Sequence, residues 1–113
     1  MSAIKEEYAV VLTTAGSEEQ ATTIARGLVE RRLAACVNIV GPMCSIYRWD
    51  GKICEEGEKL LVIKTRPRLF DRVTEAIGEL HTYEVPEVVM LPLSAVSASY
   101  GAWLAANLES ADD

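Results

Sequence analysis

Apolar residues in this chain recur at two different spacings, and these spacings predict seven secondary-structure elements. Dense apolar and β-branched runs of strand length occupy residues 8–15, 35–49, 52–65 and 88–93. Apolar residues three or four positions apart predict helices that begin near Ser17, Pro67 and Ser97. Ser17 and Gln20 also have the spacing of a capping box, in which Ser17 accepts from the Gln20 amide and the Gln20 side chain reaches back.

The second and third strand segments carry the signals of a hairpin. Asp50-Gly51 favours a two-residue type I′ turn, so the strands on either side of it pair with each other. This turn places Tyr47 opposite Cys54. Gly41-Pro42 interrupts the first of the two strands, where we expect a bend.

Two strand–helix–strand units joined by a hairpin predict an α+β fold of the ferredoxin-like class. In this split β-α-β sandwich, four antiparallel strands form a sheet and the two crossover helices cover one face. The chain adds a C-terminal helix and a long hairpin between residues 35 and 65. We expect a single domain over residues 1–113, with an ordered core at about 8–108 and a polar end at 110–113 that frays.

The second face of the expected sheet is also apolar. In the first strand, Ala9 and Val11 alternate with Val10 and Leu12, and residues 60–63 and 88–91 show the same pattern. A sheet with one solvated face normally alternates apolar and polar side chains, and large apolar patches are rare on monomers. The third helix can cover part of this face. The pattern therefore predicts a homo-oligomer in which other subunits cover the rest.

Composition and charge exclude several classes of protein. The 113-residue chain has a net charge of -6 and no basic stripe, which argues against nucleic-acid binding. It contains no run of about 18 apolar residues, so no membrane-spanning helix is expected. The three cysteines lack the spacing of a metal or disulfide framework, and the first residues lack a secretory pattern. Reduced thiols and a cytoplasmic location are expected.

The segment 81–87 (HTYEVPE) concentrates ligand-type side chains between a predicted helix and a predicted strand. We expect a weak divalent-metal site at His81 with Glu84 or Glu87, completed by another subunit, because too few donors converge within one extended segment. The alternative interpretation is structural. Pro86 would then fix the entry to the strand, and His81 would end the preceding helix.

Five further side chains have both a functional and a structural interpretation. Cys36 is either a soft-metal or redox thiol, or a packed small side chain. Lys64 follows an apolar run, so it either pairs with Glu84 or Glu87 or lines a cleft between subunits that accepts a small anion. Three aromatic residues would line the same cleft or anchor an interface. They are Tyr47, Trp49 and Tyr83.

The chain also contains a series of motifs in a fixed order: Ile24-Ala25, Leu28-Val29-Glu30, Leu33 to Asn38, Tyr47 to Lys52, Ile63-Lys64-Thr65, Tyr83 to Glu87, and Tyr100 to Leu104. Together these motifs resemble the CutA divalent-cation tolerance family over nearly the whole chain. The resemblance implies a ferredoxin-like fold and a homotrimer in which long hairpins reach across to neighbouring subunits. It also implies an architecture similar to that of the trimeric PII signalling proteins.

The resemblance implies a role in tolerance of copper and other divalent metals, exerted by binding and not by catalysis. Where some bacterial members carry a cysteine and two histidines, this chain has Thr13, Leu80 and His81, so we expect weak binding at positions between subunits. No cofactor is expected to be required, and a divalent metal such as copper is the one candidate. The alternative is a PII-like regulatory trimer that binds a small anion, with Lys64 as its supporting residue.

Overall fold

The computed structural model describes residues 7–109, so the expected polar end at 110–113 lies outside the described residues. All seven predicted elements are present, in the predicted order. They are β1 (Ala9–Ala15), α1 (Glu18–Glu30), β2 (Cys36–Trp49), β3 (Lys52–Thr65), α2 (Phe70–Leu80), β4 (Val89–Pro92) and α3 (Ala98–Asn107). Within residues 7–109, no helix has both the length and the apolar character needed to cross a bilayer.

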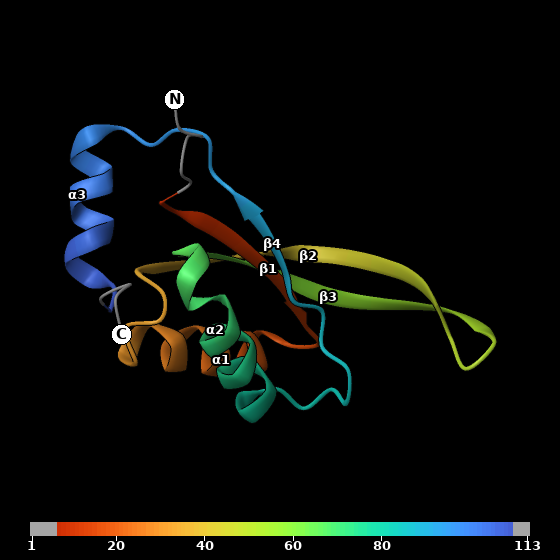
Figure 1. Cartoon of the computed structure of the whole chain (residues 1–113). Helices are drawn as coiled ribbons and strands as arrows, with labels where there is room; N and C mark the ends of the chain where they lie inside the picture. The colour runs from red at the N-terminus through yellow and green to blue at the C-terminus, as the bar shows by residue number, and fades with distance from the viewer. Residues whose placement is uncertain (1–6, 110–113) are drawn as a thin grey trace.

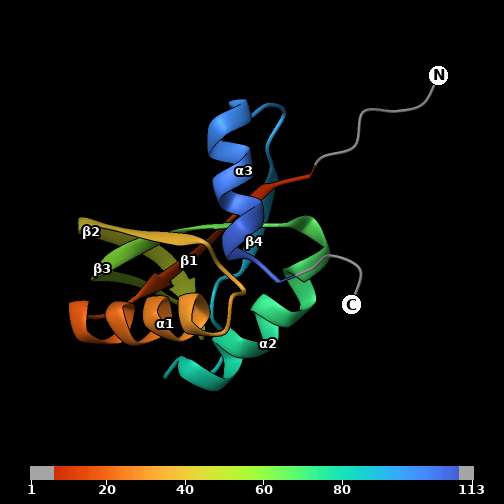
Figure 2. The same cartoon turned by 90° about the vertical axis from the view of Figure 1, so that its left-hand side faces the viewer.

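The four strands form one sheet in the order β2-β3-β1-β4, and every neighbouring pair is antiparallel. Helices α1 and α2 lie together on one face of this sheet, as Figures 1 and 2 show. The β2–β3 hairpin projects beyond the rest of the molecule, and α3 lies at the opposite end of the sheet (Figure 1). The predicted ferredoxin-like α+β fold, with its added C-terminal helix and long hairpin, is confirmed.

The hydrophobic core lies between the sheet and the two crossover helices. Val11 of β1 and Ile63 of β3 are directly paired, so both side chains point to the same face, where they are fully buried. The helices contribute Ile24 and Leu28, which lie one turn apart on α1, and Ile77 of α2 to the same core. Burial of these aliphatic side chains fixes both helices on this face of the sheet.

The other face of the sheet is apolar and largely uncovered. Its side chains include Val40, Val89 and Leu91, which are 50%, 46% and 53% exposed. The third helix reaches the sheet at Tyr8, whose hydroxyl donates to the Gly101 carbonyl at 3.0 Å, and leaves these three side chains exposed. Leu104, the one buried residue of α3, and Leu108, which follows the helix, both join the main core. The helices and strands of residues 7–109 therefore leave much of this apolar face open.

The helix-cap predictions are right for the backbone and wrong for one side chain. Ser17 Oγ accepts from the Gln20 amide at 3.1 Å, as expected. The Gln20 side chain does not reach back, because its Nε2 donates to the Leu80 carbonyl at 2.9 Å. It therefore connects the start of α1 to the end of α2. Pro67 begins a short 3-10 turn that precedes α2 and does not lie in the α-helix itself.

The hairpin has the predicted turn, register and irregularity. Asp50 and Gly51 have φ angles of 57° and 78°, both in the left-handed region that a type I′ turn requires. Tyr47 lies opposite Cys54, as the turn position predicts. The register shifts between Val40 and Met43, where the Gly41-Pro42 peptide bond is cis. All three cysteines have free thiols.

Replacing Ser17 with alanine should lower the free energy of unfolding by about 1 kcal/mol, because the Gln20 amide loses its side-chain acceptor. Urea denaturation followed by circular dichroism measures this loss. Thr22→Ala, on the exposed side of α1, is the matched control and should not lower stability, because alanine favours the helix more than threonine does. Equal losses in the two variants would contradict the role of the cap.

Candidate functional site

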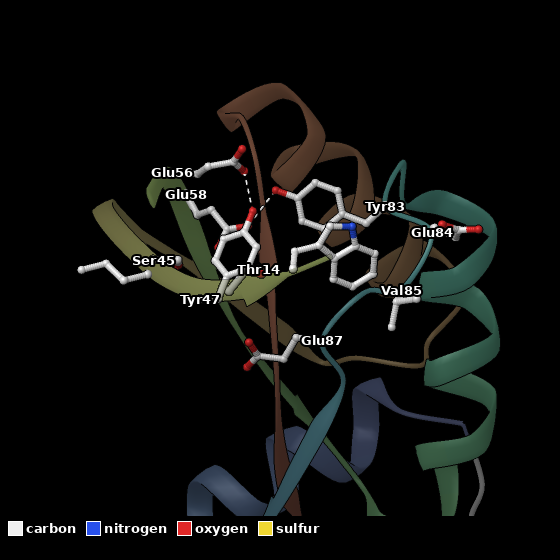
Figure 3. A pocket seen from close by; sticks show the side chains of 11 residues that line it. Thr14, Ser45, Tyr47, Glu56, Glu58, Tyr83, Glu84, Val85 and Glu87 are labelled. Atoms are coloured by element: carbon white, nitrogen blue, oxygen red, sulfur yellow. Dashed lines mark hydrogen bonds between the residues drawn. The ribbon is translucent and has the colours of Figure 1, made fainter. Parts of the chain in front are cut away.

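A cleft of about 640 Å³ opens between the hairpin and the segment that follows α2 (Figure 3). Its walls come from three parts of the sequence: the end of β1, both strands of the hairpin, and residues 83–87. The lining residues are Thr14, Ser45, Ile46, Tyr47, Trp49, Glu56, Glu58, Tyr83, Glu84, Val85 and Glu87. The predicted site residues Tyr47, Trp49, Tyr83, Glu84 and Glu87 are thus brought together.

The bulge at Gly41-Pro42 decides which side chains of β2 reach this cleft. Val40 pairs with Leu60, and Met43 pairs with Glu58. Between these two pairs β2 advances by three residues and β3 by only two. One extra residue exchanges the two faces of the strand. Beyond the bulge, the side of β2 that carries Ser45, Tyr47 and Trp49 is therefore the side on which β3 carries Glu56 and Glu58.

Two tyrosine–carboxylate hydrogen bonds cross the cleft wall (Figure 3). Tyr47 donates its hydroxyl to Glu56 Oε1 at 2.9 Å, and Tyr83 donates to Glu58 Oε2 at 2.7 Å. The bond to Glu56 raises the pKa of Tyr47 to about 12. Burial, followed by the bond to Glu58, raises the pKa of Tyr83. Both shifts move the ionisation of the phenols further above physiological pH.

Tyr83 fits here because Gly16 has no side chain. A Cβ atom on Gly16 would lie 3.0 Å from the Tyr83 hydroxyl oxygen. The small residue that follows β1 therefore gives the ring access to Glu58, which is only 9% exposed. The segment that follows α2 is held against the hairpin by this contact.

His81 has a structural position, and both of its ring nitrogens are engaged. It forms the C-cap of α2, as expected, and is only 9% exposed. Nε2 lies 2.6 Å from the Thr14 carbonyl oxygen, and Nδ1 accepts from the Tyr83 amide at 3.0 Å. A carbonyl only accepts and an amide only donates, so these partners assign a neutral ring with its proton on Nε2. Binding a metal through His81 would require one of these bonds to break.

The metal-ligand residues predicted from the sequence are not clustered within one chain. Glu84 and Glu87 line the cleft, whereas His81 and Cys36 do not. Within residues 7–109, no group of three or more His, Cys, Asp or Glu residues is placed to hold a metal ion. A site shared between subunits therefore stays a prediction.

Lys64 does not line the cleft with the aromatic residues. It lies opposite Cys36 on the uncovered face of the sheet, six residues along β3 from Glu58, or about 20 Å at the rise of an extended strand. Its ammonium donates to Asn38 Oδ1 at 2.5 Å and lies 3.9 Å from Cys36 Sγ. The expected pairing of Lys64 with Glu84 or Glu87 is replaced by these two contacts.

The cleft is acidic. Four of its lining residues are glutamates, and none of the lining residues is Lys, Arg or His. Sequence reasoning missed Glu56 and Glu58, although the Asp50-Gly51 turn already placed Glu56 opposite Ser45, diagonally across from Tyr47. This charge favours cations over anions, because like charges repel when they are brought into a partly desolvated cleft.

The model of the family described as CutA1 divalent ion tolerance protein matches residues 9–107. The chain belongs to this family. It is 51% identical to the divalent-cation tolerance protein CutA of Thermus thermophilus over 98 residues, which cover 87% of this chain and 95% of that protein. The solved structure of the T. thermophilus CutA1 superposes with a TM-score of 0.87 at 49% identity, covering 90% of this chain and 99% of that one.

Two other relatives differ in the location that their names give. The chloroplastic CutA of Arabidopsis thaliana is 43% identical over 95 residues, and the match covers 84% of this chain and 52% of that protein. The solved structure of the periplasmic divalent cation tolerance protein CutA of Archaeoglobus fulgidus has a TM-score of 0.87 at 33% identity, with 90% and 99% coverage. The family name describes tolerance of divalent ions and specifies no catalysed reaction.

Replacing Tyr83 with phenylalanine should lower the free energy of unfolding by about 1–3 kcal/mol, because the buried Glu58 carboxylate loses its donor. Tyr47→Phe removes the same kind of bond at an exposed pair and should cost no more than about 0.5 kcal/mol. Chemical denaturation of both variants at neutral pH measures the difference. If the two variants lose the same stability, the Tyr83–Glu58 bond has no special role.

The ionisation of Tyr47 should be visible at high pH. Its pKa in the folded protein is about 12, above the ordinary value of 10, so folding favours the protonated phenol. The stabilising effect is complete below pH 10 and is lost as the pH rises towards 12. Ultraviolet titration of phenolate absorbance should lose a step near pH 12 in Tyr47→Phe. Loss of absorbance near pH 10 in the variant, with the step near pH 12 retained, would show that the pKa of Tyr47 is not raised.

Proposed function

We propose that this family member is a homotrimer that contributes to tolerance of copper or other divalent cations by binding them weakly, without catalysing a reaction. The observation that carries the proposal is the acidic cleft, which has four glutamates and no cationic side chain in its lining. Carboxylate oxygens are common ligands of divalent metals. The names of the T. thermophilus and A. fulgidus relatives support the same class of function.

The uncovered face of the sheet supports self-association. Val40, Val89 and Leu91 are about half exposed, and a patch of this kind is expected to be buried by other copies of the chain. The projecting hairpin supplies a second surface that extends away from the core (Figure 1). The number three comes from the family resemblance.

We place the metal on Glu84 or Glu87, with further ligands from a neighbouring subunit. This placement follows from the donors on the described part of the chain, where fewer than three ligand-type side chains converge. His81 is less suitable because its ring nitrogens are engaged, and Cys36 is less suitable because the Lys64 ammonium lies 3.9 Å from its sulfur. A cytoplasmic location is also part of the proposal.

A PII-like trimer that binds a small anion is the second candidate function, and Lys64 is the observation that favours it. The Lys64 ammonium lies on the face expected to be covered by other subunits, and it contacts an amide oxygen and a sulfur. An anion bound between subunits would supply the countercharge. This site would be separate from the acidic cleft.

Native mass spectrometry of the purified protein should detect a trimer, and isothermal titration of metal-free protein with Cu(II) should detect weak binding. The double variant Glu84→Gln/Glu87→Gln should bind at least about tenfold more weakly, because the loss of one charged ligand costs roughly 1.5–3 kcal/mol and 1.4 kcal/mol corresponds to a factor of ten. Glu75→Gln, on the exposed side of α2, is the control for the loss of charge and should bind as the wild type does.

Equal Cu(II) binding by the double variant and the Glu75 variant would exclude Glu84 and Glu87 as ligands. A monomer in native mass spectrometry would contradict the assembly. A co-purifying small anion whose retention depends on Lys64, tested with Lys64→Gln, would favour the PII-like function instead.

A further inference from the structure

Two cationic side chains lie close together at the end of β3, on the uncovered face of the sheet. Arg66 follows β3 with an extended backbone, at φ −118° and ψ 147°, so its side chain points to the same side as that of Lys64, two residues earlier. Two residues so related have Cα atoms roughly 7 Å apart, a short distance for two long side chains. Lys64 and Arg66 can therefore reach one common ligand.

The Tyr8 ring holds Arg66 in place. The guanidinium carbon of Arg66 lies over this ring, 5.4 Å from its centroid. The Tyr8 hydroxyl in turn donates to the Gly101 carbonyl of α3 at 3.0 Å, so the ring is held between the sheet and the third helix. A guanidinium that lies over an aromatic ring keeps its N–H groups for bonds in its own plane. Arg66 is thus positioned without using its hydrogen-bond donors.

Neither cation has a carboxylate partner within residues 7–109. The Lys64 ammonium contacts the Asn38 amide oxygen and the Cys36 sulfur, and the Arg66 guanidinium makes no hydrogen bond to a described residue. Arg66 Nε is moreover buried without a partner. Charged donors are costly to bury unpaired, and this face is the one that self-association is proposed to cover. The two positive charges therefore need an anion from outside the chain.

The donors around this position match an oxyanion of the phosphate type. Arg binds phosphate oxygens through its planar fork, and Lys binds them as a point charge. Asn38 accepts from Lys64 through its oxygen, which leaves its NH₂ group as a further donor. A phosphoryl group carries about one and a half to two negative charges near neutral pH and offers at least three acceptor oxygens. A monocarboxylate offers one charge and two oxygens, which is too little for two cations and an amide.

We propose that Lys64, Arg66 and Asn38 bind a phosphate-type oxyanion, which neutralises this end of the sheet face where other copies of the chain cover it. The inference rests on the second candidate function, the anion-binding trimer, and deepens it by adding two residues to the site and naming the ligand class. The ligand is either inorganic phosphate or the phosphoryl group of an organic molecule. The acidic cleft lies towards the other end of β3 and takes no part.

Isothermal titration of the assembled protein, freed of bound anions by dialysis, should show saturable binding of inorganic phosphate at constant ionic strength. Arg66→Gln and Lys64→Gln should each bind phosphate at least about tenfold more weakly, the effect of losing one charged hydrogen-bond partner. Arg26→Gln, on the exposed side of α1, removes the same charge from the opposite side of the sheet and should bind phosphate as the wild type does.

Two further titrations define the ligand class. Acetate at the same ionic strength should bind more weakly than phosphate, because it carries a single charge. Glycerol 3-phosphate distinguishes the two sources of the phosphoryl group. Competition with bound phosphate would assign the site to phosphate esters, and exclusion of the ester would assign it to the free ion.

Absence of saturable phosphate binding would overturn the proposal, and carboxylates of a neighbouring copy would then be the countercharge. Equal weakening in Arg26→Gln would overturn it as well, because the effect would reflect general attraction to positive charge. Circular dichroism establishes that each variant is folded. Arg66→Lys replaces Arg66→Gln if the latter does not fold, and it should still bind more weakly than the wild type because it lacks the planar fork.

Failure of this proposal is distinguishable from failure of the proposed function. A different co-purifying anion, retained through Lys64, can persist when phosphate does not bind. Cu(II) binding is proposed at Glu84 or Glu87, so Lys64→Gln and Arg66→Gln should titrate with Cu(II) as the wild type does. In the opposite case, phosphate binds to protein that shows no Cu(II) site.

Discussion

Antiparallel pairing fixes which side chains share a face of the hairpin, and one extra residue at Gly41-Pro42 exchanges those faces halfway along β2. The root of the hairpin therefore continues the apolar face of the sheet, through residues such as Val40. Beyond the bulge, the same face presents Tyr47 and Trp49 alongside the glutamates of β3. An apolar surface suited to self-association and an acidic, aromatic surface suited to cations thus lie in succession on one pair of strands.

The opposite wall of the cleft is fixed by non-local hydrogen bonds. His81 connects the Thr14 carbonyl to the Tyr83 amide, and the Tyr83 hydroxyl reaches Glu58. These contacts position the segment that carries Glu84 and Glu87, so the acidic side chains of that segment face those of the hairpin. The same hydrogen bonds occupy the ring nitrogens of His81, which makes the only histidine of the chain a positioning residue in this structure.

The features that the sequence predicts well are those set by local chemistry. The Asp50-Gly51 turn and the Ser17 cap each depend on a few neighbouring residues, and the strand and helix spacings depend on a one-sided core. The position of Lys64 depends on strand register, and the partners of Gln20 and His81 depend on contacts between distant segments. The neighbouring residues in the sequence therefore did not predict these contacts. Glu56 and Glu58 could not be assigned to the cleft from the sequence because they lie in a mostly charged run of residues, 55–59, which normally indicates a solvated segment.

The position of the bulge also has a consequence for how the hairpin can change in length. Beyond Gly41-Pro42, the two strands are paired without interruption as far as the Asp50-Gly51 turn. Adding or removing residues symmetrically near the turn would alter how far the hairpin extends, yet leave the cleft residues nearer the bulge on their present face. A single-residue insertion in β2 between the bulge and Tyr47 would instead turn Tyr47 and Trp49 away from the glutamates. The length of the hairpin and the side chains of the cleft can therefore vary independently during evolution, provided that each change in length adds or removes the same number of residues in both strands.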